Sequence, residues 1–458
     1  MFDPERAEKR FGCGLAPGIA GPASAAEIME RLRAPDEAAA AFPIPTFSQV
    51  LPRLRGLQLA RQARRTTATD TARAETLESY RALRKALRLD ATRWGGHVLL
   101  RRALTRDGLR ERLTAFWADH FTARGDGQLW GLVQLPYVEE AVRPHVTGRF
   151  GDMLRAVMTQ PLMLSYLDQH RSAGANSPIG QARGRGLNEN LAREMLELHT
   201  LGADGPYTQA DVTELAKLLT GLTFHMERGF EFRPNLAEPG AETVLGISYG
   251  GETARLADIY AALDALAAHP ATAAHVARKL AVHFISDRPD AALVDALSGV
   301  FQSTDGDLAA LTEALLTHPA AWQPEARNVK RPVDFIGSAL RALDLVPRHI
   351  PLTAPRKMDA LFTAPMTLMG QPPGQPPGPD GFAEDDLDWI TPQRLAARIS
   401  WAMTAPFQIR RALPRPEEFA RAALGIDIPA PVRSAALGAE TRAEGIGLIL
   451  ASPAFQRV

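Results

Sequence analysis

The chain has 458 residues, of which 45% are hydrophobic and 23% are charged, a composition typical of a globular protein with a sizeable core. Lysine plus arginine equals aspartate plus glutamate, at 52 each, so the whole chain offers no net field to nucleic acid or to a membrane surface. The single cysteine, Cys13, excludes a disulfide framework and a cysteine-based metal cluster.

The N-terminal stretch, MFDPERAEKRFGCG, is charged from its third residue and contains no apolar segment typical of a secretory signal. Elsewhere, no run approaches the roughly 18 apolar residues that a membrane span requires. As given, the sequence therefore predicts a cytoplasmic protein without a membrane span.

Apolar residues recur mainly at three- and four-residue spacing, with abundant alanine and leucine, so helix dominates. We expect a mainly α fold: a multi-helix orthogonal bundle with one small β-hairpin near residues 222–234 and long irregular loops. The stretch AFPIPTF ends an N-terminal helical unit over residues 1–42. A main helical domain is expected over residues 43–369, and a Pro-rich loop with C-terminal helices packing on it over residues 370–458.

Residues 51–112 are strongly basic, with sixteen lysines and arginines against six aspartates and glutamates. Because only two aromatic residues, Tyr80 and Trp94, stand among the arginines, nucleic-acid binding is not expected. We interpret the stretch as solvated helix faces that also neutralise an acidic site elsewhere.

The motif FWADHFT, which ends a helix begun near Asp107, places Asp119 and His120 among large aromatic residues. A histidine in such surroundings is commonly a core residue bonded to a carbonyl group. Near carboxylates it would suit acid/base chemistry or metal binding. Arg110 and Arg112 on the same helix are the expected counter-charges for the glutamates described next.

The stretch LNENLAREMLELHTLG follows a long, basic, Gly-rich loop (residues 169–186) and predicts one helix over residues 188–201 that ends at Gly202. On a helical wheel, Asn190, Glu194 and Glu197 form a polar stripe beside the leucine face. The remaining polar residues of this helix are Asn188, Glu189 and Arg193.

A second helix follows after a short loop, and Thr208 with Asp211 resembles an N-terminal capping box. Asp211 and Glu214 share a stripe of this helix, and Lys217 stands near Glu214. The short connection makes the two helices neighbours, so carboxylates from both can converge. Clustered carboxylates raise one another's pKa, which supplies a proton donor near neutral pH, or they bind a divalent cation as a metal cofactor. The alternative to a functional site is that the same side chains form a buried network of ion pairs.

The alternating segment LTFHMERGFEFRP predicts a β-hairpin that turns near Arg228 and Gly229, and TVLGISY is expected to pair with it. Farther along, His275, Lys279 and His283 share a helix face, but the two histidines are too far apart for one metal. Lys279 is an expected cation partner of a glutamate. Lys330 and Arg331, before VDFIGSALRAL, are expected counter-charges at a helix start.

The stretch LNENLAREMLELHTLGADGPYTQADVTELAKLLTGL resembles the hallmark block of the bacterial domain-of-unknown-function family 1800. FWADHFT, MLSYLD, ARKLAVHFISDRP, VKRPVDFIGSALRAL and GQPP followed by DWITP resemble its other landmarks, in the same order and over nearly the whole chain. The resemblance implies a mostly helical protein without an established activity. It also implies a partner, another protein of unknown function encoded nearby. Carried over by position, its motif residues are Asn188, Glu189, Asn190, Arg193, Glu194, Glu197, Asp211, Glu214, Asp119 and His120.

The chain departs from this family's pattern at three points. Many members look exported, whereas the start of this sequence shows no apolar segment typical of a leader, so export is not expected. Ala237 and Glu238 stand where members often carry a His-Asp pair, and Phe382 stands where they carry tryptophan. A mechanism that needs the missing histidine is therefore disfavoured.

Two hypotheses follow. In the first, a groove lined by Glu194, Glu197, Asp211, Glu214 and His120 performs acid/base or metal-assisted hydrolysis. Glu194 is then the acid and Glu197 or His120 the base, while Asp119, Asn188, Glu189, Asn190, Arg193, Arg110 and Lys279 complete the site. In the second, the same side chains form a buried structural network in a non-catalytic scaffold whose irregular loops bind a partner chain or glycan.

Overall fold

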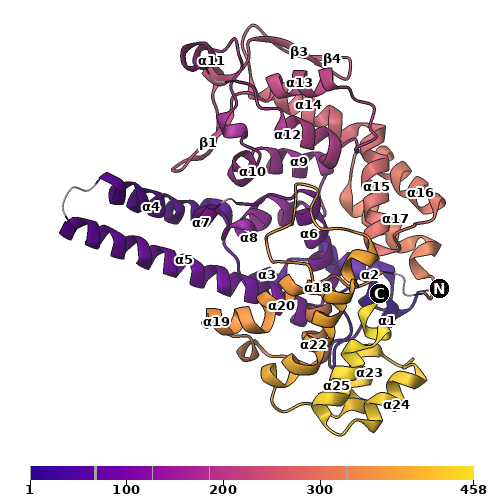
Figure 1. Ribbon diagram of the computed structural model, residues 1–458. Helices are drawn as coiled ribbons and strands as arrows, with labels where there is room; N and C mark the ends of the chain where they lie inside the picture. Colours follow the sequence, from indigo (N-terminus) through magenta and orange to yellow (C-terminus); the bar gives the residue numbers. More distant parts are fainter. Residues whose placement is uncertain (1, 67–69, 126, 185, 326–327) are drawn as a thin grey trace.

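The computed structural model describes residues 2–66, 70–125, 127–184, 186–325 and 328–458. These residues are mainly helical, with two small two-stranded sheets, so the predicted mainly α fold with a small hairpin is confirmed (Figure 1). The first helices are α1 (Pro4–Arg10), α2 (Ala25–Arg33), α3 (Glu37–Ala41), α4 (Phe47–Thr66) and α5 (Asp70–Leu104).

The elements of the central part follow in chain order. They are α6 (Gly108–His120), α7 (Gly127–Trp130), α8 (Gln134–Tyr137), η1 (Val138–Val142), η2 (Arg143–His145), α9 (Phe150–Met158), α10 (Pro161–Tyr166), η3 (Gln169–Arg171), α11 (Pro178–Arg183), α12 (Asn190–Glu194), η4 (Met195–His199), α13 (Gln209–Leu218), β1 (Leu222–His225), β2 (Gly229–Phe232), η5 (Pro234–Leu236), β3 (Gly240–Val244), β4 (Ile247–Gly251), α14 (Leu256–Ala268), α15 (Pro270–Phe284), α16 (Ala291–Ser303), α17 (Leu308–Thr317) and η6 (Pro319–Trp322).

The C-terminal elements complete the molecule. They are α18 (Pro332–Ala342), η7 (Pro347–His349), α19 (Pro355–Met358), η8 (Asp359–Thr363), α20 (Ala364–Leu368), α21 (Asp386–Trp389), α22 (Pro392–Ile409), α23 (Pro416–Leu424), α24 (Ala430–Gly438), α25 (Arg442–Ala451) and α26 (Pro453–Gln456). Within the described chain, no helix combines the length and the hydrophobicity needed to cross a bilayer.

Helices α4 and α5 form an antiparallel arm that projects from the body (Figure 1). Helix α5 has 35 residues and is therefore about 50 Å long. Near the body, Leu54 and Leu57 of α4 and Leu87 of α5 are buried, whereas the residues toward the tip are mostly exposed. The basic composition of residues 51–112 is thus largely the solvated surface of this arm.

The buried apolar side chains form two clusters, here called the first core and the second core. The first core gathers residues between Ala7 and Trp322, including Phe116, Trp117 and Phe284. The second core gathers the base of α5 with α18 and the C-terminal helices, including Phe335 and Trp401. Helix α5 supplies both, because Trp94 belongs to the first and Leu99 to the second.

The predicted hairpin is present, with β1 and β2 pairing antiparallel and Leu222 opposite Phe232. The expectation that TVLGISY pairs with it is wrong, because β3 and β4 pair with each other, with Val244 opposite Ile247. The turn between them holds Leu245 at φ 51° and Gly246 at φ 79°. Two successive positive φ values fit a tight two-residue hairpin turn.

The helix expected over residues 188–201 divides in two. Helix α12 covers Asn190–Glu194, and the segment η4, Met195–His199, is a π-helix. The same geometry recurs in η1 and η8. A π-helical turn shifts the angular phase of the residues after it, and such turns are frequent at functional sites.

Candidate functional site

A cavity of about 990 Å³ lies where the two cores meet. Trp94 and Val138 of the first core line it together with Leu99 and Met366 of the second. Two of the π-helical segments, η1 and η8, contribute to its wall. A volume of this size suits a drug-sized molecule, and ligand sites favour such interfaces between cores.

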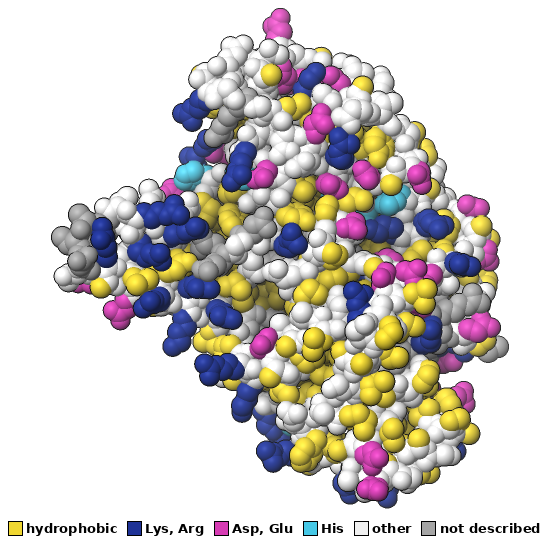
Figure 2. Space-filling view, in the orientation of Figure 1, with side chains coloured by type: hydrophobic (Ala, Val, Ile, Leu, Met, Phe, Trp, Pro, Cys, Tyr) yellow, Lys and Arg dark blue, Asp and Glu magenta, His cyan; other side chains and the backbone are white. Residues whose placement is uncertain are grey.

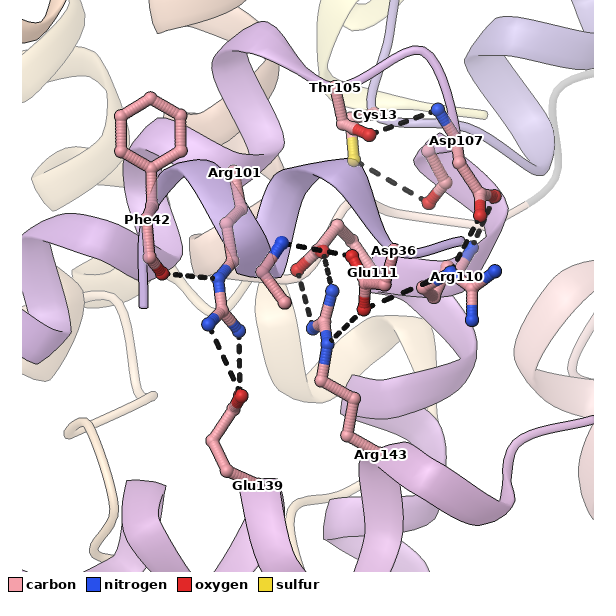
Figure 3. A network of polar contacts seen from close by, with 12 residues as sticks. Cys13, Asp36, Phe42, Arg101, Thr105, Asp107, Arg110, Glu111, Glu139 and Arg143 are labelled. Carbon is pink, nitrogen blue, oxygen red and sulfur yellow. Dashed lines mark hydrogen bonds and ion pairs between the residues drawn. The ribbon is translucent and has the colours of Figure 1, made fainter. Parts of the chain in front are cut away.

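Three buried arginines on the wall of the cavity are held by carboxylates. Arg101 Nη1 lies 2.6 Å from Glu139 Oε1, and Arg102 Nη1 lies 2.6 Å from Asp334 Oδ1. Arg143 Nη2 lies 2.5 Å from Glu111 Oε1. Figure 3 shows Arg101 and Glu139 pointing toward one another, and Arg143 reaching Glu111 and Asp36. Because both partners of each pair are largely buried, these ion pairs fix the wall and leave little free charge on it.

A fourth arginine, Arg331, joins segments that are far apart in the sequence. Its Nη1 donates to Asp119 Oδ2 at 2.7 Å, and its Nη2 lies 2.6 Å from Glu384 Oε1. Glu384 Oε2 in turn lies 3.2 Å from Nδ1 of His283. We call Arg331, Asp119, Glu384 and His283 the Arg331 cluster; all but Glu384 line the cavity.

His283 is buried, with a side chain only 3% exposed. Burial lowers the pKa of its imidazole, and the opposing effect of Glu384 does not reverse the change. Nε2 is shielded from solvent and has no hydrogen-bond partner among the described residues. In the tautomer that donates Nδ1–H to Glu384, Nε2 carries a lone pair that accepts no hydrogen bond from the described residues.

The pKa of Glu384 is held low although its carboxylate is mostly buried. Burial by itself would raise this pKa, but Arg331 and then His283 outweigh it and lower the value to about 2. The carboxylate is therefore charged at neutral pH, so it can orient His283 and stabilise its protonated form.

Local sequence explains how the cluster is assembled. Arg331 is the N-cap residue of α18 and precedes Pro332, so its backbone is extended, with φ −60° and ψ 153°, and lies outside the helix. The Pro-rich loop between α20 and α21 passes in front of α6 in Figure 1. There the backbone N–H of Phe382 donates to Asp119 Oδ1 at 2.9 Å. Gly381 has φ 85°, and a Cβ on it would meet the Asp119 carbonyl oxygen at 2.7 Å, so glycine is required.

Asp119 is the predicted catalytic residue that the structure places in this cluster. Its neighbour His120 is buried and points elsewhere, with Nε2 3.1 Å from the carbonyl oxygen of His199. His199 Nδ1 lies 3.0 Å from the carbonyl oxygen of His120 in return. Burial lowers the pKa of both imidazoles, which makes them neutral links between α6 and η4.

Lys279 lies near the Arg331 cluster. Burial lowers the pKa of its ammonium group, while the carboxylates of Glu384, Asp119 and Asp380 act in the opposite direction. The acidic groups that Lys279 faces are therefore Glu384, Asp119 and Asp380. The glutamates of α12 and η4 are not among them.

Glu194 and Glu197, the predicted catalytic carboxylates, form a separate group with Asp380 of the Pro-rich loop. Glu194 is half-buried, and its pKa is raised by burial, by Glu197 and by Asp380. Neither glutamate lines the cavity. Glu194 and Glu197 therefore lie beside the Pro-rich loop, the same loop that contacts Asp119 through Phe382.

The other polar residues of the predicted helix make local contacts. Asn188 Nδ2 donates to the Leu167 carbonyl oxygen at 3.1 Å, and its Oδ1 accepts from the N–H of Asn190 at 2.9 Å. Glu189 accepts from Arg193 at 3.2 Å and from Thr213 at 2.8 Å.

The second predicted helix and Arg110 also contribute locally. Asp211 forms the predicted capping box with Thr208, which is confirmed, and also accepts from the N–H of Leu245 at 2.7 Å. Glu214 pairs with Lys217 at 2.6 Å. Arg110 donates to Asp107 at 2.7 Å and to the Ala34 carbonyl oxygen at 2.9 Å, so it does not neutralise Glu194 or Glu197 as expected.

The described residues contain no group of three or more His, Cys, Asp or Glu side chains that could hold a metal ion.

The chain belongs to the DUF1800 family, described as proteins of unknown function, whose model matches residues 6–457. The resemblance inferred from the central block is thereby confirmed over essentially the whole chain. No curated protein and no solved structure matches the chain.

Proposed function

We propose that the protein is an acid/base hydrolase that holds a small substrate in the cavity between the two cores. The observation that carries this proposal is the pair of His283 and Glu384, in which Nδ1 faces the carboxylate and Nε2 has no partner among the described residues. His283 belongs to the wall of a cavity large enough for a drug-sized molecule.

In the proposed reaction, a small shift of the His283 ring first brings Nε2, which is shielded in the structure, into contact with a water molecule in the cavity. Nε2 then takes a proton from this water as the water oxygen attacks the substrate. The imidazolium then returns that proton to the leaving group, so the proton count balances over one turnover. Glu384 is a positioning residue, because it orients the imidazole and stabilises its charged form. Arg331 acts through Glu384 and Asp119, which it holds in place.

The predicted catalytic carboxylates Glu194 and Glu197 have no step in this reaction, because they are not among the residues that line the cavity. The metal-assisted variant of hydrolysis has no ligand set to support it among the described residues.

A second candidate function is binding without catalysis. It is favoured by the ion pairs of Arg101, Arg102 and Arg143, which leave the wall nearly free of reactive charge. The cavity would then serve as a receptor site, and the Arg331 cluster would serve only to join α6, α15 and the Pro-rich loop.

Hydrolysis of a panel of p-nitrophenyl esters and phosphate esters separates these functions. We expect His283→Gln to reduce kcat at least 100-fold, a typical share for a general base, and Glu384→Gln to reduce it less. Burial lowers the pKa of His283 below the ordinary value of about 6.5, so activity should persist at pH 6.5 and fall only on further acidification, because the base must be neutral.

His225→Gln, in β1, is the matched control and should retain full activity. Circular dichroism of each variant checks that its fold is kept. Equal activity in wild type and His283→Gln, or no turnover of any ester by the folded wild type, would contradict the hydrolase proposal.

A further inference from the structure

The cavity has a basic rim. Arg88 of α5 and Arg356 and Lys357 of α19 line it, and all three are exposed. None of the three forms an ion pair or a side-chain hydrogen bond with a residue in the described ranges. The arginines deeper in the wall, Arg101, Arg102 and Arg143, are by contrast each ion-paired with a carboxylate. Asp359, also exposed in the lining, offsets only part of the charge.

Behind the rim the lining is largely apolar. Trp94, Val138, Met358 and Met366 are buried and face the same space. Figure 2 shows yellow hydrophobic side chains in the hollow beneath the arm, with dark blue basic side chains along the adjoining surface. Methionine side chains are flexible and polarisable, so they adapt to apolar ligands of varied shape.

Helix α5 leaves room for the occupant at one glycine. A Cβ added to Gly95 would meet no atom closer than the Met358 Cε at 4.0 Å. At the adjacent Gly96, by contrast, an added Cβ would lie 2.3 Å from Leu352 Cδ2. Gly96 therefore serves close packing, whereas Gly95 leaves part of the cavity open.

We infer that the ligand of this cavity is an amphiphile, with a hydrocarbon or aromatic body in the apolar interior and an anionic headgroup at Arg88, Arg356 and Lys357. A carboxylate and a phosphate headgroup satisfy the rim by the same chemistry. The inference rests on the proposed function only in identifying this ligand as the substrate; the binding itself needs no reaction.

Binding of matched amphiphiles tests the inference. Dodecanoate, dodecyl phosphate and dodecanol share one hydrocarbon chain and differ in headgroup, and each is titrated into the full-length protein by calorimetry. We expect at least one of the two anions to bind about tenfold more tightly than the alcohol, equivalent to about 1.4 kcal/mol. This preference should shrink as salt is added, because the rim is exposed.

Three variants distinguish the parts of the inference. The triple variant Arg88→Gln, Arg356→Gln, Lys357→Gln should bind the anion and the alcohol with equal affinity. Gly95→Leu should abolish binding of all three ligands, since the new side chain enters the cavity and favours the helix. Gly56→Leu on α4, where an added Cβ also meets nothing within 4 Å, is the matched control and should bind as wild type.

Equal affinity of dodecanol and both anions for wild type would overturn the anionic headgroup. Unchanged binding by Gly95→Leu would overturn the location. His283→Gln should bind the amphiphile as tightly as wild type, because binding needs no reaction. If wild type passes these binding tests but hydrolyses no ester, the proposed function is refuted and the inferred ligand class still stands.

Discussion

Replacing Arg331 by methionine removes the cation that two mostly buried carboxylates share. The structure sets the magnitude, because the Glu384 pKa falls from an ordinary 4.5 to about 2. One pH unit of pKa corresponds to about 1.4 kcal/mol, so the change represents roughly 3 kcal/mol of favourable interaction, most of it from Arg331. Breaking a buried ion pair on one side costs about 3–5 kcal/mol. We expect Arg331→Met to lower the free energy of unfolding by about 3–5 kcal/mol at pH 7.

The sign of the pH dependence follows from the direction of the pKa change. A carboxylate with a lowered pKa in the folded state contributes its full stability above about pH 4.5 and loses it as the pH falls toward 2. In Arg331→Met, Glu384 loses the cation that lowers its pKa, so it can take up a proton at higher pH than in wild type. The difference between wild type and variant should therefore shrink from pH 7 to pH 3.5.

Urea unfolding followed by circular dichroism at pH 7, 5 and 3.5 measures both effects. Arg33→Met is the matched control, because Arg33 and its partner Glu313 are about half exposed and such pairs contribute little. Adding Asp119→Asn and Glu384→Gln to Arg331→Met should recover part of the loss. A difference below about 1 kcal/mol at pH 7, or one that stays constant with pH, would refute the reasoning.

Three further predictions concern other parts of the molecule. Burial lowers the pKa of Lys330 to about 7, so between pH 7 and 10.5 only the unfolded chain holds this proton and wild-type stability should rise with pH. Lys330→Met should therefore stabilise the protein most at pH 6 and lose that advantage at high pH. A thermal-unfolding pH profile that is the same in wild type and variant would contradict this. Burial raises the pKa of the Cys13 thiol to about 12, so the native protein should not react with a thiol reagent at pH 8, while the urea-unfolded chain should react fully. Thr208→Ala removes the capping box of α13 and should cost about 1 kcal/mol in urea unfolding, and Thr208→Ser should restore it; equal stabilities of all three proteins would show that the cap is unimportant.

Local patterns in the sequence were sufficient for several elements. Alternation predicts the β1–β2 hairpin, and Thr208 with Asp211 predicts the start of α13, because each signal lies within a few residues. The pairing of TVLGISY was mispredicted because its turn uses Leu245 and Gly246. Leucine is unusual at positive φ, so the turn lacks the Asn-Gly or Asp-Gly signal that marks such hairpins.

The candidate site was predicted only in pieces. Asp119 and the basic Arg331 were singled out, but the partner of His283 is Glu384, 101 residues away. No spacing rule connects residues that meet only when the Pro-rich loop folds over α6. The π-helix after Glu194 is similarly invisible to a wheel drawn at 100° per residue, so the direction of Glu197 could not be derived. The acidic run after the prolines, FAEDD, was the one signal that could have pointed to Glu384.

The glycine pair in α5 divides that helix into two functional lengths. Beyond Gly95 and Gly96 toward the tip, the helix carries Arg88 and Trp94; toward the body it carries Arg101 and Arg102, which carboxylates hold fast. The outer length thus supplies an exposed arginine at the edge of the cavity, and the inner length supplies arginines fixed in its wall, so a single helix forms both the open and the rigid side of the same space.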